Sequence, residues 1–224
     1  VGVSEKSIMS NLRHMSAEAV GEYAVGDVIA TYENFVVQEQ KMQEQDLTNI
    51  YDLERSLIPH MIEMRMKGVR IDIERAHKVA AHFKGLEDNA RQSLHDLSGI
   101  WVDSPWAARE LVPVLDIAGI KYPYTAKTNK PSVTKEWLDE MLEIEGHGPV
   151  AQAIKDYRRF NKARTTFVEQ FFIETPVNGR VHCNFNLLKG ENGGTISGRL
   201  SYDSPNMQQI PARDPDIGPL VRAL

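Results

Sequence analysis

Apolar residues recur every three or four positions along the N-terminal part of the chain, as they do on one face of an α-helix. Residues 16–45 carry them at four-residue intervals, so we predict a first helix there. The same spacing continues from about residue 47 and predicts a second helix, which Gly68 ends because glycine readily adopts the left-handed conformation found after helices. A third helix is predicted over residues 73–97, with Asp72 as its N-terminal cap.

The middle of the chain is more broken. A short helix is predicted to begin at Ser104-Pro105 and to reach residue 115, because proline suits the first turn of a helix. Residues 122–131 are rich in Pro, Lys and Thr and predict an exposed loop, in which Asn129 tolerates a left-handed backbone. Two more helices are predicted, over residues 134–145 and from Pro149 to about residue 172.

After residue 176 the hydrophobic period changes to two, which indicates a half-buried β-strand. Val181, Cys183 and Phe185 alternate with polar residues. A turn over residues 190–194 and a second strand over residues 195–200 would complete a hairpin. The predicted fold class is therefore mainly α with a small antiparallel β-sheet (α+β).

Composition narrows the class of protein. Of 224 residues, 42% are hydrophobic and 25% charged, which is typical of globular proteins. No stretch approaches the roughly 20 apolar residues of a membrane-spanning helix, and no signal peptide is visible. The single Cys183 excludes an internal disulfide. We therefore expect a cytoplasmic protein that does not bind membranes.

The charge is unevenly distributed. The net charge is −5, but residues 155–199 contain eight Lys or Arg and four Asp or Glu, so this stretch is +4 and the remainder is −9. A nucleic-acid-binding protein needs a positive surface and not a positive whole, so the distribution is compatible with DNA binding.

The strongest motif is Thr-Ile-Ser-Gly-Arg-Leu-Ser at residues 195–201, followed by Pro-Asn-Met-Gln-Gln-Ile-Pro-Ala-Arg at residues 205–213. It resembles the family A DNA polymerase pattern T-x-[ST]-G-R-[LF]-S and P-N-[LM]-Q-x-I-P-x-R, with Tyr202 where the family usually has a small residue. The resemblance implies that Arg199 contacts the minor groove at the primer end.

A donor-only side chain such as Arg199 suits that role, because the minor groove presents acceptors at similar places in every base pair. The nearby amides at Asn206, Gln208 and Gln209 can donate to base or sugar acceptors, and the resemblance implies DNA contacts for them. The alternative is that Arg199 pairs with an acid and that the amides cap a turn.

A second motif, residues 157–168, contains a Tyr-Arg pair followed by basic residues and two threonines. It resembles the helix between thumb and palm in the same family. That resemblance implies that Lys162, Arg164 and Thr166 contact primer or template phosphates, as cations and a hydroxyl can do without reading sequence. Phe167 replaces the usual tyrosine. The alternative is a solvated basic face.

Tyr23 and Asp27 are four residues apart and therefore share a helical face. They resemble the last motif of the family's 3′→5′ proofreading exonuclease, which implies that Asp27 binds Mg²⁺ and that Tyr23 orients the attacking water. The other carboxylates of that site would precede Val1, so we expect the exonuclease site to be incomplete in this chain.

The resemblance also implies a domain order. Residues 1–46 would end the exonuclease domain, residues 47–174 would form the helical thumb, and residues 175–224 would begin a truncated palm. The wording of the C-terminal motif and of residues 184–190 leans towards phage versions of the enzyme.

The implied function is that of part of a DNA-directed DNA polymerase with proofreading. Its partners would be primer–template DNA and, in the whole protein, dNTPs, with two Mg²⁺ ions held by palm carboxylates that this chain lacks. The chain alone should therefore be inactive as a polymerase. We expect the whole protein to work in the cytoplasm of a bacterium or of a phage-infected cell. A processivity factor is not identified. Two alternatives stay open: a non-catalytic duplex-DNA-binding module derived from such a polymerase, and an unrelated helical interaction protein.

Overall fold

The computed structural model describes residues 14–187 and 194–224, and the chain divides into two compact units, residues 1–60 and 61–224. The first unit contains helix α2 (Ala17–Glu44) and the start of α3 (Thr48–Lys67). Both helices were predicted, and α3 ends at Gly68, whose φ is +62°. Most of the described apolar residues of α2 are exposed, Val28 for instance to 68%. This division by contacts leaves the expected exonuclease, thumb and palm boundaries as predictions.

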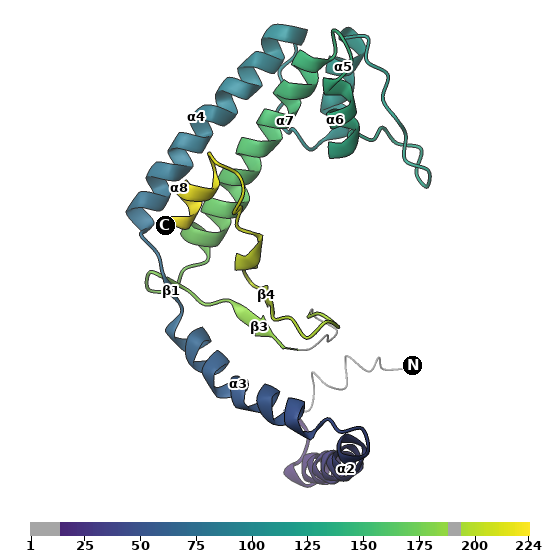
Figure 1. Cartoon of the computed structure of the whole chain (residues 1–224), viewed down its shortest axis with the longest axis vertical. Coiled ribbons are helices and arrows are strands. Elements are labelled where there is room, and N and C mark those ends of the chain that lie inside the picture. Colours follow the sequence, from purple (N-terminus) through teal and green to yellow (C-terminus); the bar gives the residue numbers. More distant parts are fainter. Residues whose placement is uncertain (1–13, 188–193) are drawn as a thin grey trace. The chain divides into compact units, whose positions relative to one another are not determined.

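Helix α4 (Ile73–Ser98) is the longest helix of the second unit. Asp72 caps it as predicted, since its carboxylate accepts a hydrogen bond of 2.9 Å from the Arg75 backbone N–H. Gly99, at φ +71°, ends it, and its N–H donates to the His95 carbonyl. The apolar face of α4 is buried along its length, and α7 (Gly148–Lys162) lies beside it (Figure 1).

Two hydrophobic clusters share α4. The first joins its C-terminal half to α5 (Ala108–Ile117), α6 (Lys135–Leu142) and α7. The second joins its N-terminal half to the continuation of α7 and to α8 (Gly218–Arg222). Fully buried side chains in these clusters include Phe83, Leu94, Leu111, Leu138, Ile154 and Val168.

The predicted start of the helix at Ser104-Pro105 is wrong, because α5 begins at Ala108. The Glu110 carboxylate accepts hydrogen bonds of 2.8 Å from the backbone N–H groups of Asp103 and Ser104. The Ala107 N–H closes a turn onto the Ser104 carbonyl. These donors are satisfied before the helix begins, so residues 104–107 stay outside it. Helix α6 is also shorter than predicted, ending at Leu142.

The helix predicted from residue 149 to residue 172 exists, but it changes type. After Lys162 it continues as a π-helix, η2 (Ala163–Glu174), in which hydrogen bonds span five residues. Phe167, Val168, Phe171 and Phe172 of η2 are buried in the second cluster. Because a π-helix has more residues per turn, the residues after position 162 that share a face differ from those of an α-helix. The spacing of apolar residues in the sequence did not indicate this change of helix type.

The strands form two small antiparallel sheets. The predicted antiparallel pair exists, but the predicted bounds of its second strand are wrong, and residues 180–181 pair elsewhere. Strand β1 (Val69–Arg70) pairs with β2 (Arg180–Val181), and β3 (Asn184–Asn186) pairs with β4 (Ser201–Asp203). The second strand lies after residues 195–200, which form a turn with Gly198 at φ +71°. Most of the predicted turn over residues 190–194 lies outside the described residues. The α+β class is confirmed.

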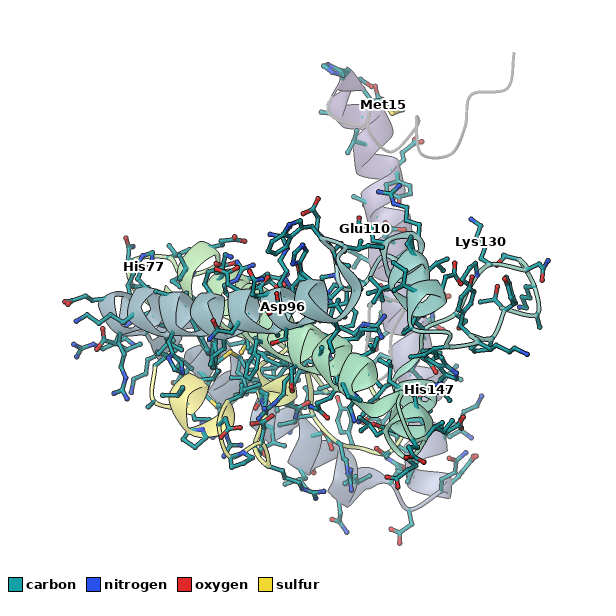
Figure 2. All side chains as sticks on the ribbon, turned by 90° about the horizontal axis from the view of Figure 1, so that it is seen from above. Met15, His77, Asp96, Glu110, Lys130 and His147 are labelled. Carbon is teal, nitrogen blue, oxygen red and sulfur yellow. The ribbon has the colours of Figure 1, made fainter. Side chains whose placement is uncertain are left out.

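The loop over residues 122–131 is exposed, as predicted. It extends away from α5 and α6, with Lys130 near its end (Figures 1 and 2). Asn129 has φ +47°, as its expected tolerance of a left-handed backbone allows. The Thr125 N–H donates to the Lys130 carbonyl at 2.9 Å, which closes the loop. No helix among the described residues is long and apolar enough to cross a membrane.

Candidate functional site

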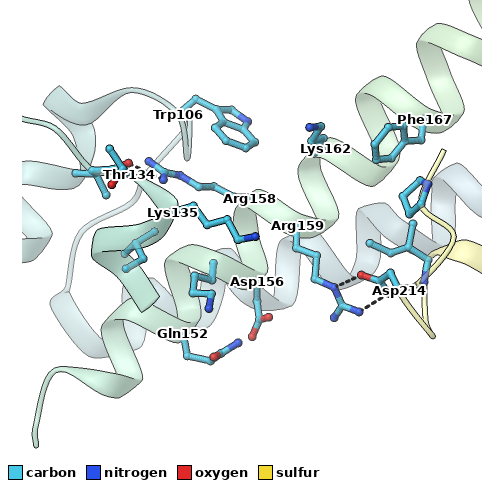
Figure 3. A pocket seen from close by; sticks show the side chains of 15 residues that line it. Trp106, Thr134, Lys135, Gln152, Asp156, Arg158, Arg159, Lys162, Phe167 and Asp214 are labelled. Atoms are coloured by element: carbon cyan, nitrogen blue, oxygen red, sulfur yellow. Dashed lines mark hydrogen bonds and ion pairs between the residues drawn. The ribbon is translucent and has the colours of Figure 1, made fainter. Parts of the chain in front are cut away.

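A groove of about 900 Å³ lies between α6, α7, the start of η2 and the segment over residues 211–217. Trp106, Val133 and Ile217 are among the apolar residues that line it. Five cationic side chains line it, from Lys135, Lys155, Arg158, Arg159 and Lys162. Figure 3 labels all of these except Lys155. Two of the five are neutralised by carboxylates within the fold and three are not. Asp156 also lines the groove, so the three free cations exceed its one free carboxylate and the groove retains positive charge.

Arg158 is held without a carboxylate. Its Nε donates to the Pro105 carbonyl at 2.7 Å, and its Nη1 donates to the Val133 carbonyl at 2.8 Å. Burial lowers the pKa of the guanidinium, which still stays charged at neutral pH because an arginine titrates so far above it. Arg158 therefore brings an uncompensated charge to the groove.

The Arg159 side chain points towards Asp214 (Figure 3) and donates two hydrogen bonds to its carboxylate. A third, of 2.6 Å, reaches Asp216. Asp214 also accepts from the backbone N–H groups of Asp216 and Ile217. The hydrogen bond from Arg159 is the main cause that lowers the pKa of Asp214 to about 2. This ion pair fastens the segment after the C-terminal motif to α7.

Arg164 has two carboxylate partners. Its Nε donates to Glu87 at 2.6 Å, and its Nη1 donates to Glu169 at 2.8 Å. Glu87 is only 5% exposed and is the one charged residue buried in the described part of the chain. These hydrogen bonds raise the pKa of Arg164. Carboxylates within the fold therefore neutralise the Arg164 guanidinium, and its observed role is structural. The expected contact with a DNA phosphate stays a prediction.

Lys162 and Thr166 lie on either side of the change from α7 to η2. Lys162 is exposed, has no carboxylate partner among the described residues, and lies 5.6 Å from the centre of the Phe167 ring. Thr166 is half-buried. Of the three residues expected to contact phosphates, Lys162 is the one with a free charge.

The C-terminal motif places Arg199 in solvent. Its side chain is exposed and has no ion pair within the described structure, while its backbone carbonyl accepts from Thr195 Oγ1 at 2.8 Å. The alternative that Arg199 pairs with an acid is therefore not what the described residues show. An exposed, unpaired guanidinium remains able to donate to an external acceptor.

Two of the three amides hold the turn, as the alternative reading proposed. Asn206 Oδ1 accepts from the Gln208 backbone N–H at 3.1 Å and caps the short helix η3 (Met207–Gln209). Gln208 Nε2 donates to the Leu200 carbonyl at 3.0 Å. Gln209 is exposed, and no side-chain hydrogen bond fixes it within the described residues. DNA contacts by these amides stay predictions.

Tyr23 and Asp27 share a face of α2, as their spacing predicted. A hydrogen bond to the Asp27 carboxylate raises the pKa of the Tyr23 phenol. In residues 14–187 and 194–224, no three His, Cys, Asp or Glu side chains lie close enough together to hold a metal ion. Tyr23 and Asp27 therefore supply one candidate metal ligand, the Asp27 carboxylate, and by themselves they do not fit a two-metal centre.

Sequence reasoning missed Trp106, Arg159, Asp214 and Glu87. The Tyr-Arg pair was noted as part of a motif, but its arginine was not assigned to the groove. Arg159 lies more than 50 residues from Asp214 and Asp216 along the chain, and no local pattern links it to them. A buried acid such as Glu87 cannot be recognised from one sequence, because a glutamate in a helix looks the same in the sequence whether it is buried or exposed.

Comparison with known proteins agrees with the motifs. The chain is 35% identical over 209 residues to a DNA-directed DNA polymerase of Pseudomonas phage M6, a match that covers 89% of this chain and 30% of that protein. It is 30% identical over 227 residues to the DNA polymerase DpoZ of Vibrio phage phiVC8, covering 98% of this chain and 35% of that protein. The chain thus spans about a third of these relatives.

Among solved structures, the fold matches the POL domain of Pol1 from M. smegmatis, determined in complex with DNA primer-template and dNTP. The TM-score is 0.65 at 23% identity, over 82% of this chain and 31% of that one. The sequence model of DNA polymerase family A matches residues 74–223, which is well over half of the chain. This protein therefore belongs to DNA polymerase family A.

Proposed function

We propose that the chain is part of a DNA-directed DNA polymerase and that residues 61–224 help to hold primer–template duplex during templated nucleotidyl transfer. The observation that carries the proposal is the exposed guanidinium of Arg199, which has no acidic partner within the described structure. Arg199 belongs to the motif T-I-S-G-R-L-S. The groove between α6, α7 and residues 211–217 carries further cations that have no carboxylate partner among the described residues.

The physical basis is that such contacts need no sequence information. Cations such as Lys162 bind phosphates of any sequence, and a donor such as Arg199 finds an acceptor in the minor groove of every base pair. The Arg159–Asp214 ion pair supports the arrangement, because it fixes the end of the C-terminal motif to the helix that carries Lys162.

We also propose the domain order that the motifs imply: the end of an exonuclease domain over residues 1–46, a thumb over residues 47–174 and the start of a palm over residues 175–224. The placement of Tyr23 and Asp27 four residues apart on α2, and so on one helical face, supports the first of these assignments. Family A polymerases use Mg²⁺, and residues outside this chain would hold the ions for polymerisation. The chain by itself would then bind DNA without extending a primer.

Binding to a fluorescein-labelled primer–template, measured by fluorescence anisotropy at several salt concentrations, tests the proposal. Arg199→Ala should weaken binding by about tenfold, the value of one good contact to a base edge. The factor should be the same for unrelated duplex sequences. Arg75→Ala, which removes another exposed arginine, on α4, is the control and should bind as the wild-type chain does.

If Arg199→Ala and Arg75→Ala bind equally well, the minor-groove role of Arg199 is wrong. If the wild-type chain shows no salt-dependent affinity for duplex DNA, the proposal that residues 61–224 hold the primer–template duplex is wrong. Primer extension with Mg²⁺ and dNTPs checks the last part of the proposal, since extension by this chain alone would contradict it.

A further inference from the structure

Trp106 stands at the rim of the groove with much of its ring in solvent. It is 53% exposed, although tryptophan is a costly side chain to leave in water. Its indole Nε1 donates a hydrogen bond of 2.8 Å to Asn161 Oδ1. The Arg158 guanidinium lies 5.2 Å from its ring centre (Figure 3). One edge and one side of the ring are therefore fixed, and a flat aromatic surface remains accessible.

The hydrogen bond that fixes Trp106 continues into the interior. Asn161 Nδ2 donates to the buried Glu87 carboxylate at 2.9 Å, and Glu87 is held in turn by Arg164. A surface aromatic ring tethered to a buried network loses little conformational freedom when something stacks on it. Less of the interaction energy is then spent on ordering the side chain, which favours binding.

The groove beside Trp106 has the charge that a phosphodiester backbone requires. Lys135, Arg158 and Lys162 have no carboxylate partner within the described part of the chain, whereas Lys155 pairs with Asp139 and Arg159 with Asp214. Asp156 also lines the groove and offsets one of these three charges, which leaves the groove positive. The volume of about 900 Å³ lies within the usual range of ligand sites. An aromatic platform next to uncompensated cations is the combination that binds single-stranded nucleic acids.

We propose that this groove binds a single-stranded DNA segment, with one unpaired base stacked on Trp106 and its neighbouring phosphates beside Lys135 and Lys162. A base inside a duplex has both faces covered by its neighbours, so the indole ring selects bases that are unpaired. The inference rests on the proposed function for its DNA partner, but it adds a second binding mode that duplex contacts by Arg199 do not supply.

The test compares a fluorescein-labelled oligothymidylate with a blunt-ended duplex, by anisotropy on the full chain. Trp106→Ala should weaken binding of the oligothymidylate by about tenfold and leave duplex binding within about twofold, since stacking of one base has that magnitude. Trp106→Phe keeps an aromatic face but loses the N–H. It should stay within about threefold of the wild type, which separates stacking from loss of the Asn161 hydrogen bond.

Trp101→Ala is a matched control. Trp101 is also 53% exposed, and an arginine, Arg91, also lies 5.2 Å from its ring, but it is not part of the groove. It should bind the oligothymidylate as the wild type does. Equal losses for Trp101→Ala and Trp106→Ala, or no loss for Trp106→Ala, would overturn the inference, as would a wild-type chain that binds duplex but no oligothymidylate. Failure to bind either DNA would instead count against the proposed function.

Discussion

Arg159 and Asp214, 55 residues apart in the chain, are joined by two hydrogen bonds, of 2.9 Å from Nε to Oδ2 and of 2.7 Å from Nη2 to Oδ1. Both side chains are about one-quarter to one-third exposed, so water screens the pair only in part. The geometry is bidentate, which is the strongest arrangement of an arginine with a carboxylate. The segment that follows the polymerase motif is thus anchored to α7 by charge as well as by packing.

This pair makes the stability of the chain depend on pH in a defined window. The pKa of Asp214 falls from 3.8 to about 2 in the folded chain, so its contribution is present above pH 3.8 and is lost as the pH falls towards 2. Asp214→Asn should lower the free energy of unfolding by roughly 2 kcal/mol at pH 7. Urea unfolding of both proteins should show this difference shrinking between about pH 4 and pH 2. A difference that does not change with pH would contradict the assignment.

Glu87 is expected to be the acid whose loss costs most. Glu87→Ala leaves Arg164 and Asn161 without their buried partner and should lower the free energy of unfolding by about 3 kcal/mol. The neighbouring Asp88 pairs with Lys84 on the exposed side of the same helix. Asp88→Ala should cost no more than about 0.5 kcal/mol. Urea denaturation of the two variants measures both values, and similar losses would show that burial of Glu87 does not matter.

Two glycine substitutions should have opposite effects. Gly68 has φ +62°, and a Cβ there would lie 2.7 Å from the His182 ring and 2.9 Å from the Val181 carbonyl oxygen. Gly68→Ala should therefore destabilise the chain, by about 2 kcal/mol or more. Gly85 lies within α4, and a Cβ there would meet nothing within 4 Å.

Gly85→Ala is the control for this comparison and should stabilise the chain by about 0.5–1 kcal/mol, because alanine has the higher helix propensity. The midpoints of thermal unfolding should move in opposite directions for the two variants. A Gly68→Ala protein as stable as the wild type would contradict this prediction, because it would require the His182 ring and the Val181 backbone to move aside at no cost.

Lys162 should contribute to duplex affinity through one phosphate. Lys162→Ala is expected to reduce the slope of log affinity against log salt by about 0.9, the value for one phosphate contact on duplex DNA. Lys78→Ala, which removes an exposed lysine paired with Glu74 on α4, should leave the slope unchanged. Anisotropy titrations over a range of salt concentrations give both slopes. An unchanged slope for Lys162→Ala would place Lys162 outside the DNA contact.

The sequence was most informative where structure depends on local chemistry. The helices over residues 16–45, 47–67 and 73–97 follow from apolar spacing, Asp72 from capping and Gly68 from its conformational freedom. The start of α5 could not be predicted, because Glu110 satisfies two N–H groups ahead of the helix that bears it. The pairing of β1 with β2 joins residues more than 100 positions apart, which no local period encodes.

The candidate site shows the same division. The motifs identified Arg199 and Lys162 as residues whose chemistry suits DNA, and the structure leaves both exposed. They could not reveal that Arg164 is compensated by Glu87, or that Gln208 is occupied by the Leu200 carbonyl. Those partners are distant in sequence or belong to the backbone, so only the folded arrangement discloses them.

The sharing of α4 by two hydrophobic clusters has a consequence for how the second unit opens. A helix buried at one end by α5 and α6, and at the other by η2 and α8, cannot leave one cluster without bending or leaving the other. Amide protons along α4 should therefore exchange with solvent at similar rates, through one common opening. The two clusters would then behave as a single cooperative folding unit.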